Sequence, residues 1–182
     1  RMQYTASSFA APLLGMFRRL GTRIEREAGL WLKLTTRQYE VFRKALDGDP
    51  LVVDGGAGSG KTIIATMLAR ARLAEGKRVL FLCFNRPLAQ VLRAEFTEAD
   101  KQQLFCGAFF DFAKRTIADD AWWDENKDDD DFYKLLVPAK LGDIAPAPAA
   151  RFDTLIIDEG QDFTAAWYEV LEKWVKPDGQ TV

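Results

Sequence analysis

The stretch Leu51-Val-Val-Asp-Gly-Gly-Ala-Gly-Ser-Gly-Lys-Thr62 decides the fold class of this 182-residue chain. An apolar run, residues 51–54, precedes a glycine-rich loop, and a segment with helical patterning follows from Gly60. Residues 55–62 have the spacing G-x-x-x-x-G-K-[ST], in which glycines let the backbone close around phosphates. Successive amides and the helix N-terminus then point at the anion. The stretch therefore predicts a strand, a phosphate-binding loop and a helix in direct succession.

Each residue of the loop has a predicted role at a nucleotide. Lys61 is predicted to reach the β- and γ-phosphates, and Thr62 to supply a hydroxyl to Mg²⁺. The other loop residues are predicted to hold the phosphates: Gly55, Gly56, Ala57, Gly58, Ser59 and Gly60. The alternative, a glycine-rich turn that happens to carry Lys and Thr, is disfavoured by the flanking strand and helix.

A second apolar run, Leu155-Ile-Ile, ends in the carboxylates Asp158 and Glu159. At the carboxyl end of a strand beside the phosphate loop, Asp158 is predicted to hold Mg²⁺. Glu159 is predicted to accept a proton from the attacking water. The alternative is a surface acidic pair. Two adjacent acids favour an NTP hydrolase over a kinase, which would not need the second one.

The rest of the chain alternates apolar strands with helices. Strands are predicted at residues 51–54, 78–84, 103–106 and 153–158, and helices at residues 36–46, 60–75, 87–96, 108–118 and 165–175. Fully apolar strands that alternate with helices indicate an α/β fold, with a parallel sheet covered by helices on both faces.

Composition narrows the chemistry. The chain is 48% apolar and 29% charged and contains no histidine, which excludes Ser-His-Asp triads and histidine general bases. Its two cysteines, Cys83 and Cys106, lie in apolar runs and are predicted to be buried thiols in a reducing cytoplasm. Residues 1–90 hold 15 Lys and Arg against 7 Asp and Glu, and residues 91–182 hold 10 against 20. We expect any polyanion to meet the first half.

Two segments interrupt the regular pattern. Residues 1–33 are predicted to be an N-terminal helical extension, ahead of a nucleotide-binding domain at residues 34–182. The basic helix expected at residues 16–28 either packs on a domain or binds a membrane surface or partner. Residues 119–150 are predicted to be a small acidic insertion in which the charge run 124–131 is a solvated or disordered loop; the alternative is a metal or basic-partner site.

Several stretches, which follow one another in the family's own order, resemble the motifs of UvrD/Rep-type superfamily 1 helicases. Asp158-Glu-Gly-Gln-Asp162 resembles the D-E-x-Q-D motif, Leu34-Thr-Thr-Arg-Gln38 the L-T-x-x-Q motif, and residues 79–89 motif Ia. The resemblance implies a RecA-like N-terminal (1A) motor domain in which Gln38 reads adenine. Gln161 would take part in catalysis and link the nucleotide to motion. It also implies that Asn85, Arg86 and Phe109 contact single-stranded DNA.

The chain departs from the family pattern at two places. The family's T-F-H-x-F motif is Ala108-Phe-Phe-Asp-Phe112 here, without its Thr and His. The aromatic residues that remain either stack bases or pack the core. Motifs III to VI are absent, so we expect an N-terminal motor domain that lacks its second motor domain and its arginine fingers. Residues 180–182 would begin the next strand, after a turn at 177–179, and that strand would lie between strands 51–54 and 153–158.

These observations predict an ATP- and Mg²⁺-dependent hydrolase domain of a helicase-like protein that moves on single-stranded nucleic acid. The fragment alone should be a weak enzyme, because arginine fingers contribute about 10³–10⁵ in rate. Two alternatives stay open: an ATP-binding switch module that moves nothing, and a P-loop kinase or unrelated NTPase. The expected location is the cytoplasm. The sequence leaves the oligomeric state open.

Overall fold

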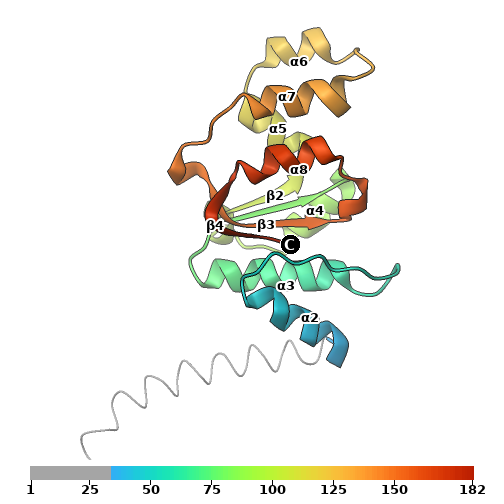
Figure 1. Ribbon diagram of the computed structural model, residues 1–182, viewed down its shortest axis with the longest axis vertical. Helices are drawn as coiled ribbons and strands as arrows, with labels where there is room; N and C mark the ends of the chain where they lie inside the picture. The colour runs from blue at the N-terminus through green and yellow to red at the C-terminus, as the bar shows by residue number, and fades with distance from the viewer. Residues whose placement is uncertain (1–33) are drawn as a thin grey trace, which may run out of the picture. The chain divides into compact units, whose positions relative to one another are not determined.

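The computed structural model describes residues 34–182 (Figure 1). The chain divides into two compact units, residues 1–40 and residues 41–182, and the fold below is that of the second unit. The basic helix expected at residues 16–28 and the extension predicted at residues 1–33 lie outside the described residues. Helix α2, Thr36–Leu46, spans the boundary between the units. Within residues 34–182, no helix is long and apolar enough to cross a membrane.

The second unit is built on a four-stranded parallel sheet with the order β2-β1-β3-β4 (Figure 1). Its strands are β1 Val79–Cys83, β2 Leu104–Ala108, β3 Phe152–Asp158 and β4 Val175–Thr181. Every residue of β1 is buried, as expected for a strand covered on both faces. The sheet confirms the predicted α/β class.

Alternation along the strands assigns the helices to two layers. Leu80 and Leu82 of β1 belong to a large apolar cluster with residues of α5 Phe109–Ile117, α7 Val137–Gly142 and α8 Ala165–Glu172. The ring of Phe81 points to the other face and meets Phe96 edge-on, with centroids 6.4 Å apart. On that face lie α3 Lys61–Ala74 and α4 Arg86–Ala94. Figure 1 shows α3 and α8 on opposite sides of the sheet.

The edge of the sheet beside β3 both confirms and corrects the sequence-based predictions. Residues 180–182 do pair with β3: Thr154 lies opposite Gln180, and Val182 exchanges backbone hydrogen bonds with Leu155 and Ile157 at 2.8 Å each. The turn predicted at 177–179 is instead an irregularity inside β4, because the register shifts between the Phe152–Val175 and Thr154–Gln180 pairs.

The strand predicted at residues 51–54 does not form. This segment lies beside β4 and makes a single backbone hydrogen bond to it, from Leu51 N to Thr181 O at 3.1 Å, while Val52 is 93% exposed. Because β4 ends at Thr181, no strand residue lies opposite Val53 and Asp54. As predicted, Val52 and Ile156 are not paired, since β4 lies between their segments.

The acidic segment is more ordered than its charge suggests. Residues 120–126 form helix α6, Asp120–Asn126, and a π-helical turn, Phe132–Leu136, leads into α7. The indoles of Trp122 and Trp123 lie 5.5 and 5.3 Å from the buried ring of Phe132. These apolar contacts fix α6, so the first part of the charge run is a helix and not the predicted loop, although Asp124 and Glu125 are exposed. Three short 3₁₀ turns complete the fold, at Asp100–Gln102, Pro148–Ala150 and Gly160–Asp162.

A buried polar network joins α3 to β4. The Arg72 guanidinium is 4% exposed and donates to Ala45 O at 3.1 Å and to Gln180 Oε1 at 2.9 Å. Gln180 is 3% exposed, and its amide donates to Ala45 O at 2.7 Å and to Asp49 O at 2.8 Å. Through the terminal nitrogens of Arg72 and the side-chain amide of Gln180, the network holds the helix after the phosphate loop, the end of α2 and β4 in one arrangement, although Arg72 Nε has no partner among the described residues.

Candidate nucleotide site

The glycine-rich loop has the backbone geometry of an anion cradle. Gly58 and Gly60 have φ values of +75° and +89°, in the left-handed region that favours glycine. A Cβ on Gly55 would come within 2.8 Å of Ser59 Oγ, so a larger residue there would force the Ser59 side chain to move. Gly60 is the N-cap of α3 and has no side-chain cap, which leaves the first amides of a 14-residue helix available to an anion.

Lys61 is held inside the loop. Its Nζ donates to Gly55 O at 2.7 Å and to Gly56 O at 3.4 Å. These carbonyl contacts place the ammonium where the loop encloses it, so that phosphate oxygens entering the loop can replace or add to the carbonyl oxygens. This position suits the predicted role of Lys61 at the β- and γ-phosphates.

Thr62 and Asp158 are brought together across 96 positions of sequence. Thr62 Oγ1 donates to Asp158 Oδ2 at 2.7 Å, and Asp158 Oδ1 accepts from the Glu159 amide at 3.1 Å. Asp158 is 3% exposed at the carboxyl end of β3. A hydroxyl and a carboxylate are the hard oxygen donors that Mg²⁺ takes from proteins, with phosphate oxygens and water completing its shell. The donor set therefore fits Mg²⁺ with a bound nucleotide.

Glu159 adopts an uncommon backbone conformation. Its φ is +55°, and the only other non-glycine residue with positive φ among residues 34–182 is Ala118. The turn aims the Glu159 side chain away from the line of β3, and Gln161 Nε2 donates to its Oε2 at 2.5 Å. The two residues that the sequence assigns to catalysis therefore contact each other directly.

Tyr168 is a site residue that sequence reasoning missed. Its hydroxyl donates to Gly160 O at 2.9 Å. A Cβ on Gly160 would come within 2.5 Å of the Tyr168 hydroxyl oxygen. Partial burial raises the pKa of the Tyr168 hydroxyl above its usual value. Tyr168 comes from α8 and belongs to no motif, so only the folded chain shows that it supports the turn after Glu159.

An open cleft of about 730 Å³ adjoins these groups. Its polar side includes the side chains of Lys61, Asp158, Glu159 and Gln161. Apolar residues of α3, β3 and the 50–53 segment form much of the remainder, among them Ile64, Leu68 and Ile156. The cleft therefore brings Lys61 of the phosphate loop, Asp158 of the predicted metal site and the predicted catalytic pair to one place, at the carboxyl end of β3.

Gln38 caps the start of α2 together with Thr35. The Gln38 Oε1 accepts from Thr35 N at 2.8 Å, and the backbone N–H of Gln38 donates to Thr35 Oγ1 at 3.3 Å. This reciprocal pair is a capping box. The contact of Gln38 with adenine stays a prediction, because residues 34–40 belong to the first unit of the chain.

The residues predicted to contact nucleic acid differ in accessibility. Asn85 caps α4, accepting from Leu88 N at 2.8 Å, and the Arg86 side chain is 65% exposed and paired with Asp111 at 2.9 Å. Phe109 is fully buried, with its ring stacked 4.3 Å from that of Trp167. Phe109 thus packs the core, which corrects its assignment to nucleic acid. Phe84, not predicted, is 45% exposed beside Asn85.

Comparison with known proteins assigns the chain to a family. Residues 38–182 match the model of a family described as an AAA domain, a match that covers most of the chain. A search of curated proteins gives no match. The family match includes the glycine-rich loop, the Asp158–Glu159 pair and all four strands.

Proposed function

The chain belongs to the AAA domain family, and from that premise we propose that it binds ATP with Mg²⁺ and is the nucleotide-hydrolysing domain of a UvrD/Rep-type motor on single-stranded nucleic acid. The Thr62–Asp158 contact of 2.7 Å carries the nucleotide part of this proposal. It joins the end of the phosphate loop to the end of β3, the two positions from which a nucleoside triphosphate and its metal are held together in P-loop hydrolases.

The side chains around the phosphates would have separate roles in binding and hydrolysis. Lys61 would neutralise charge on the β- and γ-phosphates, while Thr62 and Asp158 would hold Mg²⁺. The bound metal ion would supply charge stabilisation for the transferred phosphoryl group. Glu159 would accept the proton of the attacking water, and its 2.5 Å contact with Gln161 would orient the carboxylate.

The nucleic-acid part of the proposal rests on the carboxyl end of β1. Asn85 fixes the start of α4, Arg86 presents an exposed guanidinium, and Phe84, two residues before Arg86, is 45% exposed. An exposed arginine and an exposed aromatic ring two residues apart suit a strand with one phosphate and one stacked base. This is also the region of the resemblance to motif Ia.

The test uses a longer form of the protein that includes a second motor domain. We expect single-stranded DNA to stimulate its ATP hydrolysis, and Glu159→Gln to remove hydrolysis while ATP still binds. Arg86→Gln should weaken DNA binding about equally for all base sequences, because phosphate contacts carry no base information. Lys134→Gln, an exposed lysine of the segment before α7, is the matched control.

Three results would contradict the proposal. Strong DNA-stimulated turnover by residues 1–182 alone would show that no second domain is needed. ATP binding without any nucleic-acid binding in the longer protein would favour the switch module. Binding of DNA that does not weaken as salt increases would argue against phosphate contacts.

A further inference from the structure

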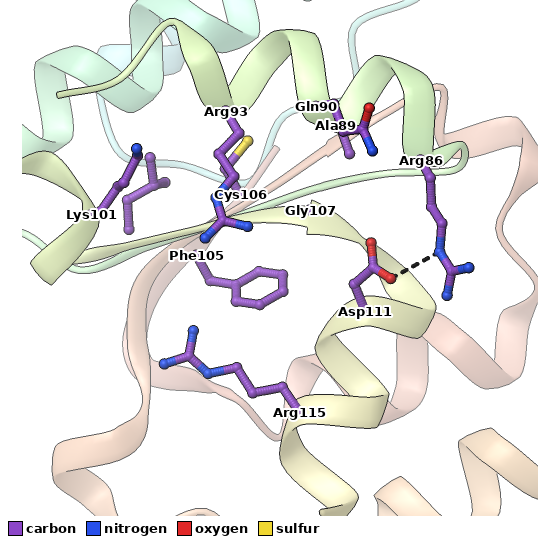
Figure 2. Close-up of a pocket in the computed structure, with 11 residues that line it drawn as sticks. Arg86, Ala89, Gln90, Arg93, Lys101, Phe105, Cys106, Gly107, Asp111 and Arg115 are labelled. Atoms are coloured by element: carbon purple, nitrogen blue, oxygen red, sulfur yellow. Dashed lines mark hydrogen bonds and ion pairs between the residues drawn. The ribbon is translucent and has the colours of Figure 1, made fainter. Parts of the chain in front are cut away.

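A second groove, of about 410 Å³, runs along the outer side of β2 (Figure 2). In the sheet, β1 separates β2 from β3, the strand that carries Asp158. The residues that line it come from α4, β2, α5 and the turn before β2. Four of them are cationic: Arg86, Arg93, Lys101 and Arg115. The sequence alone did not predict this groove, because its cations are spread over 30 positions.

Two of these cations have no counterion. Arg86 pairs with Asp111, and Lys101 pairs with Glu98. Arg93 and Arg115 are exposed and form no ion pair with any residue of the 34–182 segment. In Figure 2, Arg93 extends from α4 and Arg115 from α5 toward Phe105 of β2. The Arg115 guanidinium lies 5.9 Å from the centre of that ring. The one carboxylate that lines the groove, Asp111, is paired with Arg86. Two guanidinium groups that approach the same ring without an ion-pair partner indicate that an anionic ligand is expected there.

The strand between these arginines is an open sheet edge. β2 pairs only with β1, and Val79 N donates to Gln103 O at 2.8 Å. Since backbone groups alternate in direction along a strand, Phe105 also turns its N–H and C=O toward β1. Leu104 and Cys106 turn theirs outward, where no described residue hydrogen-bonds them. The groove therefore offers alternating backbone donors and acceptors as well as positive charge.

We propose that this groove binds an extended acidic segment of a partner protein, which adds to β2 as a further strand. A peptide backbone supplies both the acceptor and the donor that the outward groups of Leu104 and Cys106 need. The sugar-phosphate backbone of DNA supplies acceptors only, and the outward carbonyls would repel it.

The two arginines also specify the pattern of the segment. Cys106 faces α4, which carries Arg93, whereas Phe105 packs edge-on against Phe112 of α5, the helix that carries Arg115. Side chains of an added strand alternate between the two faces of the sheet. Two consecutive acidic residues would therefore meet Arg93 and Arg115 in turn.

The probe is a fluorescein-labelled peptide, acetyl-Thr-Val-Asp-Asp-Val-Thr-amide, titrated with the full chain by fluorescence anisotropy. We expect saturable binding that falls about tenfold with either Arg93→Gln or Arg115→Gln, the effect of losing one charge-assisted hydrogen bond. Lys114→Gln removes the same charge from a neighbouring exposed residue that does not line the groove, and should leave affinity within about twofold. Because all three residues are exposed, the variants should fold.

Two further measurements separate the proposal from its competitors. The Asn-Asn form of the peptide should bind at least about tenfold more weakly. A 20-nucleotide oligo-dT should bind the Arg93→Gln and Arg115→Gln variants as it binds the wild type, because Arg86 is the groove residue that the proposed function assigns to DNA. In ¹⁵N-labelled protein, the Cys106 amide should become protected from solvent exchange when the peptide binds. Absence of peptide binding, equal binding of the Asn-Asn form, weaker oligo-dT binding by the two arginine variants, or an unprotected Cys106 amide would each overturn the proposal.

Discussion

Replacing Gln180 with leucine should destabilise the fold strongly, although the side-chain volume hardly changes. Gln180→Leu removes three hydrogen bonds: those to Ala45 O and Asp49 O, and the one from the Arg72 guanidinium at 2.9 Å. A bond to a buried charged group contributes about 1.5–3 kcal/mol, and a neutral bond about 1 kcal/mol. Arg72 keeps Ala45 O, and Asp49 is exposed, so water can satisfy its carbonyl. The expected loss is therefore about 3 kcal/mol, or roughly 6–12 °C in Tm.

The assay is urea unfolding followed by tryptophan fluorescence. Gln102→Leu is the matched control, because Gln102 is exposed in the turn before β2 and should change the free energy of unfolding by no more than about 0.5 kcal/mol. If Gln180→Leu unfolds at the same urea concentration as that control, the buried network does not fix β4 to α3, and this reasoning fails.

Three further predictions concern local chemistry. Partial burial raises the pKa of Asp153, but hydrogen bonds from a lysine and a backbone amide lower it by more, so the net shift of the pKa is downward. The stability that the Asp153 carboxylate adds should be complete above about pH 4 and lost as pH falls through the folded pKa. Asp153→Asn should therefore flatten acid unfolding curves. Burial raises the pKa of Cys83 to about 11 and of Cys106 to about 12, so iodoacetamide should label neither at pH 8 in the native chain but both in urea; fast native labelling would contradict this. Gly160→Ala should lower the unfolding midpoint, because the added Cβ would lie 2.5 Å from the Tyr168 hydroxyl. Adding Tyr168→Phe, which removes that hydroxyl, should relieve part of the loss. If the effects of the two substitutions simply add, the contact does not exist.

The features that the sequence predicted correctly are those written in local patterns. The apolar run of β1 and the glycines of the loop each carry their own signal, because strand burial and left-handed backbone depend on nearby residues. Asp158 could be placed near Thr62 because a hydroxyl and a carboxylate in these two motifs are both expected at one Mg²⁺ ion.

The features that the sequence missed depend on distant partners. Residues 51–54 read as a strand by composition, but a strand needs a neighbour along its whole length, and β4 offers only Thr181. Phe109 has the residue type of a base-stacking side chain, and only its contact with Trp167 shows that it is buried. The unpaired Arg93 and Arg115 likewise come together only when β2 lies between their helices.

The central claim is that residues 55–62 bind a nucleoside triphosphate, and calorimetric titration with Mg²⁺-ATP tests it most directly. Wild-type protein should bind ATP, and GTP more weakly if Gln38 reads adenine. Lys61→Ala removes the ammonium held 2.7 Å from Gly55 O and should weaken ATP binding by at least about tenfold. Lys134→Ala, which removes an exposed lysine outside the cleft, should bind ATP as the wild type does. Equal ATP affinity in wild type and Lys61→Ala would contradict the assignment of the site.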